Sequence, residues 1–300
     1  MLRVGMVGLG IMGKPMAKNI LKKGFSLMVS DINQEAVEEV AGCGAAAGGY
    51  QEVAANCDVI LLSLPNAAIV KDVIFGENGL ASALKAGTIV CDTSSVSPED
   101  SRECAQRLEK LGVDFVDAPV SGGEPGAINA TLSIMCGGKQ EAFETLMPVF
   151  QAIGTSALLI GDSGAGSITK LANQIIVNLN ITAVGEAMVF AAKAGVDPMK
   201  VYQAIRGGLA GSAVLDAKAP MMCAGNFKPG GTIQINHKDI RNVLSAAHAI
   251  DAPVPFTAQL FEMQQALKVA GCFKDDHSAY VKYFEKLAGV KVSDCCKKED

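Results

Sequence analysis

A lysine and two amide side chains share one face of a predicted helix near the middle of the chain. Lys170 lies one to two turns after Gly164-Ala165-Gly166, and Asn173 and Gln174 follow it at the i+3 and i+4 positions. Their neighbours are largely apolar, which favours partial burial of the ammonium group. A partly buried lysine beside a bound hydroxy acid can give or take the hydroxyl proton. Most lysines are solvated, so a second indication of a site is needed.

A serine and two glycines provide that second indication. Ser121, Gly122 and Gly123 end the segment 117–123, which follows a predicted strand at the edge where open α/β sheets bind ligands. The two glycines leave backbone N–H groups accessible to a carboxylate. Ser-Gly-Gly alone is also an ordinary loop composition. Together with Lys170, it favours a loop that binds the carboxylate of a small acid.

A glycine-rich turn near the N-terminus predicts a dinucleotide site. Gly8-Leu9-Gly10-Ile11-Met12-Gly13 follows the first predicted strand and precedes residues with helical spacing. Gly8 permits the tight turn, Gly10 lets a pyrophosphate approach the backbone, and Gly13 allows close packing of helix on strand. The helix N-terminus behind the turn attracts phosphate groups.

The same residues also suggest a nucleoside triphosphate loop. Residues 8–14 match the pattern G-x-x-x-x-G-K, which normally continues with Ser or Thr. Pro15 occupies that position and offers neither a hydroxyl group for Mg²⁺ nor an amide hydrogen. The missing metal ligand disfavours an ATPase.

Asp31 ends the second predicted strand and bears on the choice of cofactor. A carboxylate at this distance beyond the glycines accepts hydrogen bonds from an adenosine ribose and repels a 2′-phosphate. Ile32 and Asn33 follow it, where an arginine would be needed to grip that phosphate. We therefore expect NAD (as NADH) to be favoured over NADP. The alternative is that Asp31 only caps the next helix.

Alternating strands and helices must position these residues in the first half of the chain. Apolar runs and helical spacing predict strands at 2–7, 26–30, 59–64, 88–91, 114–116, 132–136 and 157–160, and helices at 34–41, 67–74, 98–111 and 140–153. The flanked segment 118–130 is predicted as a loop. This alternation is typical of a parallel sheet covered by helices on both faces.

A long helix separates this half from a second, helical half. Residues 164–195 form one helical pattern of about 30 residues, and later helical segments are separated by Gly and Pro turn signals. The prediction is a Rossmann-type, doubly wound α/β domain at 1–162, followed by an all-α domain at 163–300 and joined to it by the long helix. The stretch 175–195 is apolar enough to suggest a membrane-spanning helix, but its polar residues favour a helix buried within the protein.

Composition limits the possible partners. The 300 residues carry a formal net charge of −5 and no basic run, so nucleic acid is not expected. The nine cysteines and three histidines show no metal-ligand spacing, so no metal site is expected, and the cysteines suggest a reduced, cytoplasmic protein. The N-terminus lacks signal-peptide features. We interpret residues 295–300 as a solvated end.

With these motifs in place, the chain resembles the β-hydroxyacid dehydrogenase family nearly from end to end. The matching segments are 8–16, 117–125, 164–174 and 237–239. Segments 204–212 and 215–221 are similar in particular to the subgroup that reduces tartronate semialdehyde.

The resemblance implies a role for each candidate residue. Lys170 would be the general acid in reduction, and Ser121, Gly122 and Gly123 would bind the substrate carboxylate while Asn173 steadies the reacting end. The cofactor would be lined by Leu64, Pro65, Asn66 and Ser95, with Lys238 closing over it. Many relatives carry a second Asn four residues beyond the lysine, where this chain has Gln174, so the role of that position stays open.

The implied reaction is NADH-dependent, reversible reduction of tartronate semialdehyde to glycerate. Hydride would pass from nicotinamide C4 to the aldehyde carbon while Lys170 protonates the oxygen. Alternative substrates within the family are succinic semialdehyde, glyoxylate and 3-hydroxyisobutyrate. A non-catalytic nucleotide sensor is a different class of function, and Lys170 with Ser-Gly-Gly argues against it. The apolar surface of 175–192 suggests a homodimer or homotetramer.

Overall fold

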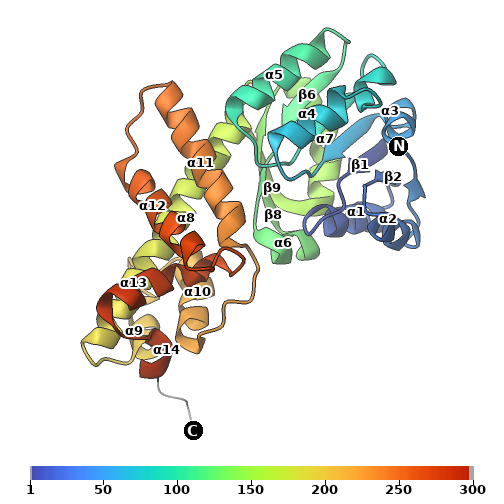
Figure 1. Ribbon diagram of the computed structural model, residues 1–300. Coiled ribbons are helices and arrows are strands. Elements are labelled where there is room, and N and C mark those ends of the chain that lie inside the picture. Colours follow the sequence, from blue (N-terminus) through green and yellow to red (C-terminus); the bar gives the residue numbers. More distant parts are fainter. Residues whose placement is uncertain (1, 297–300) are drawn as a thin grey trace. The chain divides into compact units, whose positions relative to one another are not determined.

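The computed structural model describes residues 2–296, and the chain divides after Lys170 into two compact units. The first unit contains a sheet with helices, and the second is helical (Figure 1). The division falls within helix α8 (Ala165–Lys193), whereas the sequence placed the boundary just before this helix.

The sheet of the first unit has a parallel part and an antiparallel edge. The parallel strands occur in the order β3 (Ala46–Ala47), β2 (Ser26–Ser30), β1 (Arg3–Val7), β4 (Val59–Leu62), β5 (Ile89–Asp92) and β6 (Asp114–Asp117). Strand β8 (Leu132–Gly137) then runs antiparallel to both β6 and β7 (Val120–Ser121), and β9 (Gly154–Gly161) runs parallel to β8. The expected wholly parallel sheet is therefore wrong at this edge. The chain turns back between β6 and β8 instead of crossing the sheet through a long connection.

Helices cover both faces of the sheet, as the sequence predicted. Successive residues of β4 point to opposite faces: Val59 and Leu61 join the core with helix α1 (Gly13–Lys22), while Ile60 and Leu62 join the core with helix α5 (Pro98–Glu109). Helices α2 (Gln34–Ala41) and α7 (Gln140–Ile153) complete the first layer, and α3 (Tyr50–Asn56) and α4 (Ala67–Phe75) complete the second. Every residue of β4 is buried, as a doubly covered strand requires.

Two short helices were not expected. Helix α3 was not predicted, and the expected loop at 118–130 contains strand β7 and helix α6 (Gly123–Asn129). In that segment Gly122 and Gly123 have left-handed backbone angles, with φ of +135° and +63°. Such glycines indicate a turn in the sequence, and here the turn leads directly into a helix.

The second unit is helical between residues 171 and 296, which confirms the predicted all-α domain. Its elements after α8 are α9 (Pro198–Ile205), α10 (Ala213–Ala224), α11 (Ile233–Ala249), α12 (Pro255–Val269), the 3₁₀ turn η2 (His277–Tyr280), α13 (Val281–Ala288) and α14 (Val292–Cys295). Another 3₁₀ turn, η1 (Leu80–Ser82), lies in the first unit. The core of the second unit joins residues of α8 to residues of α10, α11 and α12.

Helix α8 is buried on one side only. Among the described residues, it is the helix whose length and composition would allow it to cross a membrane, and 44% of its most apolar window is buried. Ile181 and Met188 are fully buried, whereas Ile176 and Phe190 are 67% and 76% exposed. The sequence suggested a buried helix, and the structure corrects this to a helix with one exposed apolar side.

The C-terminal cysteines are not solvated in the way the sequence suggested. Cys295 and Cys296 are partly buried and pack against the core of the second unit, where α14 contacts α10. The solvated-end prediction is therefore wrong for these two residues, and its remainder, residues 297–300, lies outside the described residues. All nine cysteines have free thiols.

Candidate functional site

The three glycines of the N-terminal turn have three different surroundings. Gly8 has a left-handed φ of +93°, and a Cβ atom there would lie 2.3 Å from the carbonyl oxygen of Ser63. A Cβ atom on Gly13 would lie 1.9 Å from the carbonyl oxygen of Gly8, so helix α1 can begin there only with glycine. No atom lies within 4 Å of a Cβ built on Gly10. Gly10 therefore faces open space that a bound group can occupy, as a pyrophosphate cradle requires.

Asp31 holds this turn to the end of strand β2. Its Oδ2 accepts a hydrogen bond from the backbone N–H of Leu9, and its Oδ1 accepts one from that of Asn33 at 2.7 Å. The cap of helix α2 is Asn33, whose Oδ1 accepts from the N–H of Ala36. The alternative that Asp31 is only a helix cap is therefore wrong.

A pocket of about 520 Å³ opens against the glycine turn, lined among others by Gly10, Ile11, Lys14 and Lys18. Both lysines point their ammonium groups at Glu39 of helix α2, at 2.7 Å and 2.6 Å. Hydrogen bonds from Lys14 and Lys18 lower the pKa of the Glu39 carboxyl to about 2. One carboxylate thus engages both ammonium groups beside the turn.

The other predicted cofactor residues of the first unit follow β4 and β5. Leu64, Pro65 and Asn66 connect β4 to α4, and Ser95 follows β5. The hydroxyl of Ser94 accepts the N–H of Leu64 at 2.8 Å and so ties the two strand ends together. Because β2, β1, β4 and β5 are adjacent and parallel, their carboxyl ends bring the glycine turn, Asp31 and these residues to one edge of the sheet.

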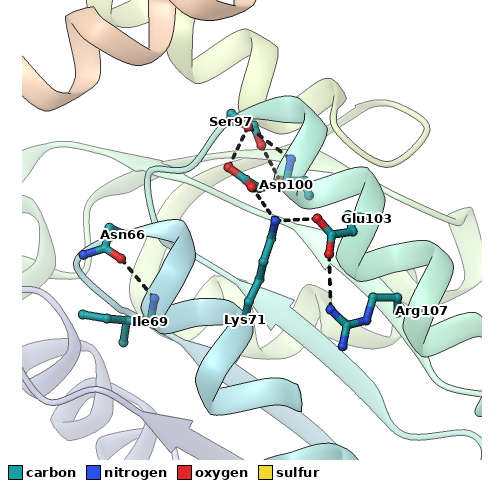
Figure 2. Close-up of polar contacts among 8 residues, drawn as sticks. Asn66, Ile69, Lys71, Ser97, Asp100, Glu103 and Arg107 are labelled. Atoms are coloured by element: carbon teal, nitrogen blue, oxygen red, sulfur yellow. Dashed lines mark hydrogen bonds and ion pairs between the residues drawn. The ribbon is translucent and has the colours of Figure 1, made fainter. Parts of the chain in front are cut away.

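A lysine between two helices fixes the helix starts at this edge. Figure 2 shows Lys71 of α4 pointing between Asp100 and Glu103 of α5, and its Nζ lies 2.7 Å from Asp100 Oδ1. The bonds to Asp100 and Glu103 raise the pKa of Lys71. Asn66 caps α4 by accepting the N–H of Ile69 at 3.0 Å. The N-terminal end of α4 is therefore held by its cap and by the ion pair of Lys71, and this fixes the position of the segment before it.

The structure places the Lys170 ammonium against the predicted carboxylate loop. Lys170 Nζ donates to the carbonyl oxygen of Val120 at 2.9 Å, and Ser121, Gly122 and Gly123 follow Val120 directly. The lysine is partly buried, as its apolar neighbours suggested. The Lys170 ammonium group and the Ser121-Gly122-Gly123 loop thus lie side by side within the first unit.

A buried carboxylate, for which no role was predicted, supports this arrangement. Asp117 ends strand β6 with 1% of its surface exposed. Its Oδ1 accepts the N–H of Gly164 and its Oδ2 accepts that of Ser167, both at 2.7 Å. Burial raises the pKa of the Asp117 carboxyl to about 6, although these backbone bonds oppose the rise. Because this value is above the ordinary 3.8, the contribution of the group to folding is greatest below pH 3.8 and is lost as the pH rises through about 6.

The remaining predicted residues belong to the second unit. Asn173 Nδ2 donates to Gln174 Oε1 at 3.0 Å, and Gln174 Nε2 donates to Asp239 Oδ2 at 2.6 Å. The other carboxylate oxygen of Asp239 lies 3.2 Å from Lys238 Nζ. Gln174, whose role the sequence left open, is therefore a buried link between Asn173 and the Asp239–Lys238 pair. Asp239 lies in the segment 237–239 that resembles the family, but no role was predicted for it.

Comparisons with known proteins identify the family. Residues 3–161 match the NAD-binding domain of 6-phosphogluconate dehydrogenase, and residues 164–284 match the NAD-binding family model of NADP-dependent 3-hydroxyisobutyrate dehydrogenase. The chain is 40% identical to 2-hydroxy-3-oxopropionate reductase of Escherichia coli, over 97% of this chain and 100% of the relative. The chain belongs to the β-hydroxyacid dehydrogenase family.

Other members of the family are nearly as similar. The 2-(hydroxymethyl)glutarate dehydrogenase of Eubacterium barkeri is 38% identical over 97% of this chain and 98% of that protein. The crystal structure of a 3-hydroxyisobutyrate dehydrogenase from Salmonella typhimurium superposes with a TM-score of 0.85 at 33% identity, covering 94% of this chain and 99% of that one. This β-hydroxyacid dehydrogenase is thus an oxidoreductase with NAD(P)-binding domains. Among residues 2–296, no cluster of three His, Cys, Asp or Glu side chains could hold a metal.

The different surroundings of Gly10 and Gly13 lead to a paired prediction. We expect Gly10→Ala to fold like the wild type and to bind NADH roughly tenfold or more weakly, because its Cβ enters the open cradle. Gly13→Ala should instead lose roughly 1–3 kcal/mol of stability, because its Cβ meets the backbone of Gly8. Thermal unfolding followed by circular dichroism and a fluorescence titration with NADH would measure both. Wild-type NADH affinity in folded Gly10→Ala would contradict the cradle.

Proposed function

We propose that this enzyme reduces tartronate semialdehyde to glycerate with NADH, and that the reaction is reversible. The observation that carries the proposal is the position of Lys170 Nζ, 2.9 Å from the carbonyl oxygen of Val120 and next to Ser121-Gly122-Gly123. The 40% identity to the E. coli 2-hydroxy-3-oxopropionate reductase supports the choice of substrate.

Each residue near Lys170 has a task in this proposal. The Ser121 hydroxyl and the N–H groups of Gly122 and Gly123 bind the substrate carboxylate, and Asn173 steadies the reacting end. The Lys170 ammonium then faces the aldehyde oxygen, stabilises the negative charge that develops on it and gives it a proton. In the reverse direction the neutral amine takes the hydroxyl proton. When bound, the nicotinamide supplies or accepts the hydride.

The cofactor residues lie along the sheet edge. The N–H groups of residues 8–13 would hold the pyrophosphate, Asp31 the adenosine ribose, and Leu64, Pro65, Asn66 and Ser95 the remainder, with Lys238 closing over the cofactor. Two observations favour NADH over NADPH. The Asp31 carboxylate lies at the end of β2, and the neighbouring cations Lys14 and Lys18 are engaged by Glu39.

A second candidate substrate follows from the comparisons. The 2-(hydroxymethyl)glutarate dehydrogenase of Eubacterium barkeri is only slightly less similar, at 38% identity, so a larger hydroxy acid is the main competitor. The L-threonate dehydrogenase of Escherichia coli, at 34% identity, suggests a sugar acid as a further test compound.

We further propose that the enzyme works in the cytoplasm as a homodimer or homotetramer. The exposed apolar side of α8, with Ile176 and Phe190, would lie in the contact between copies, since large apolar side chains are usually covered. Light scattering after size-exclusion chromatography should give a mass above the 31.0 kDa of one chain. A monomer at micromolar concentration would contradict the proposed oligomer. Recovery of the native enzyme outside the cytoplasmic fraction would contradict the proposed location.

The decisive experiment is a panel of substrates with both cofactors. NADH or NADPH absorbance is followed with tartronate semialdehyde, succinic semialdehyde and glyoxylate, and the reverse reaction is followed with glycerate, 3-hydroxyisobutyrate, 2-(hydroxymethyl)glutarate and L-threonate. The proposal requires the highest kcat/KM for tartronate semialdehyde. A higher value for another compound would reassign the substrate within the family.

Replacement of Lys170 tests the proton donor. We expect Lys170→Ala to bind NADH normally and to lose about 10²- to 10⁴-fold in kcat, the range for general acid–base catalysis. Lys193→Ala is the matched control, because Lys193 lies on the same helix and its ammonium donates to the carbonyl oxygen of Ala288; this variant should keep wild-type kcat. Turnover at the wild-type rate in Lys170→Ala would remove this lysine from the mechanism.

Replacement of Asp31 tests the cofactor preference. In Asp31→Asn the negative charge disappears while one oxygen can still accept a backbone N–H. We expect the ratio of kcat/KM for NADH to that for NADPH to fall by about tenfold or more, because repulsion of the 2′-phosphate is lost. Glu35→Gln, an exposed carboxylate in the first turn of the next helix, is the control. An unchanged ratio in Asp31→Asn would show that this carboxylate does not select the cofactor.

A further inference from the structure

We propose that Asp117 is a positioning residue that fixes the Lys170 ammonium by holding the first turn of α8 against the end of strand β6. This role rests on the proposed function of Lys170 as proton donor. Asp117 itself contacts neither the substrate loop nor the ammonium group in the described contacts, so it would act through the helix.

Both carboxylate oxygens of Asp117 are used by the start of α8. The first N–H groups of a helix have no partner within the helix. Here the N–H of Gly164 and that of Ser167 each reach one oxygen of Asp117 at 2.7 Å. With 1% of its surface exposed, Asp117 cannot be replaced in this contact by bulk water. The carboxylate is also favourably placed at the positive end of a long helix.

These contacts close a ring between two segments of the chain. Lys170 lies three residues, or about one turn, beyond Ser167 on α8. Val120 lies three residues beyond Asp117 on the other segment, and its carbonyl oxygen accepts Lys170 Nζ at 2.9 Å. The carboxylate therefore joins the two segments at one end and the ammonium joins them at the other. A shift of the first turn of α8 would move Lys170 Nζ away from Val120 and from the neighbouring Ser121.

The first turn of α8 packs closely against its neighbours. A Cβ atom on Gly166 would lie 2.3 Å from the carbonyl oxygen of Met135, and one on Gly137 would lie 2.7 Å from Asp117 Oδ1. The hydroxyl groups of Ser101 and Ser167 are 2.9 Å apart and tie the same turn to helix α5. The backbone of α8 thus rests directly on the strands at the place where the Asp117 carboxylate accepts its first N–H groups.

A buried carboxylate is an energetically costly cap for a helix, because burial disfavours its charged form. A single side-chain oxygen of a partly buried serine or asparagine caps other helices of this chain, as Ser97 does for α5 and Asn66 for α4. Asp117 instead keeps a charged group in a site where burial opposes ionisation. A demand for two simultaneous acceptors at one fixed place explains this choice, because a carboxylate supplies both without a competing donor.

The test compares Asp117→Asn and Asp117→Ser with the control Asp114→Asn. Asn offers one acceptor oxygen, and its NH₂ group would face the N–H of Gly164 or Ser167, two donors that repel each other. Ser offers one hydroxyl oxygen and has no such NH₂ group. Asp114 lies at the other, partly exposed end of β6 and pairs with Lys139. The measurements are kcat per NADH-binding site, NADH affinity, and the solvent deuterium isotope effect on kcat.

We expect kcat per NADH-binding site to fall about 10- to 100-fold in both Asp117 variants, the loss associated with a displacement of about 1 Å. NADH affinity should stay within twofold of the wild type, and the solvent isotope effect should rise because proton transfer becomes slower. Asp114→Asn should match the wild type in all three. An unchanged kcat and isotope effect per NADH-binding site, even with lower thermal stability, would show that Asp117 serves only the fold.

Two further measurements keep the outcome decisive. Should neither Asp117 variant fold, Ser101→Ala loosens the same turn of α8, and an unchanged kcat in it would overturn the positioning role. The Lys170→Ala variant separates this inference from the proposed function. A fully active Lys170→Ala refutes the proton donor and the positioning role together, whereas an inactive Lys170→Ala with fully active Asp117 variants refutes the positioning role alone.

Discussion

The hydrogen bond from Lys170 to the carbonyl oxygen of Val120 is the contact on which the proposed chemistry depends. A lysine side chain has four rotatable carbon bonds and loses much conformational freedom when its end is fixed. Here a backbone oxygen fixes it, so no second charged side chain needs to lie beside the substrate. The same short segment supplies the acceptor for the lysine and, one residue later, the serine and glycines suited to a carboxylate. Donor and binding loop therefore cannot shift independently.

The parallel sheet imposes the second constraint, because it collects loops from distant parts of the sequence at one edge. The turn after β1 leaves Gly10 open, while Gly8 and Gly13 are pressed against other backbone atoms. Asp31 reaches across from the end of β2 to hold the turn by the N–H of Leu9. In the proposed function this carboxylate serves two purposes, since it orders the glycine turn and would place a negative charge beside the adenosine ribose. The proposal therefore couples the structure of the turn and the cofactor preference through one side chain.

Local patterns in the sequence predicted most of the elements that position the site. Helix α2 and strand β2 agree with their predicted bounds, because the apolar residues of α2 repeat with helical spacing and those of β2 form one short run between Ser26 and Ser30. Helix α6 was mistaken for a loop because its first residues are Gly-Glu-Pro-Gly, which are turn formers. The antiparallel β8 could not be distinguished from a parallel strand, since a buried strand reads as the same apolar run in either direction.

Those parts of the candidate site that belong to a motif with a fixed local geometry were predictable from the sequence. The parts that depend on contacts between distant residues were not predicted. The glycine turn belongs to the first kind. The contacts of Asp117 with Gly164 and Ser167 belong to the second, because they span 47 and 50 residues and nothing in the neighbourhood of Asp117 announces them. Gln174 and Asp239, 65 residues apart, are a similar case. A polar residue in an apolar segment indicates that it has a hydrogen-bond partner, but the identity of that partner becomes known only from the folded structure.

The polar residues of α8 illustrate what such a partner does for a long apolar helix. Asn178 is fully buried, and its Nδ2 donates to the carbonyl of Gln174 at 2.9 Å while its Oδ1 accepts the hydroxyl of Tyr280 at 2.8 Å. Gln264 in turn donates to the same hydroxyl. Each polar atom thus has its bond inside the second unit, and the free-energy cost of burying it is offset. Asn178 was among the polar residues that disfavoured a membrane span in the sequence analysis. Their physical role is to fix the helix in one register against its neighbours, because an apolar helix face alone would tolerate a slip by one turn, whereas a buried amide with a single matching partner does not.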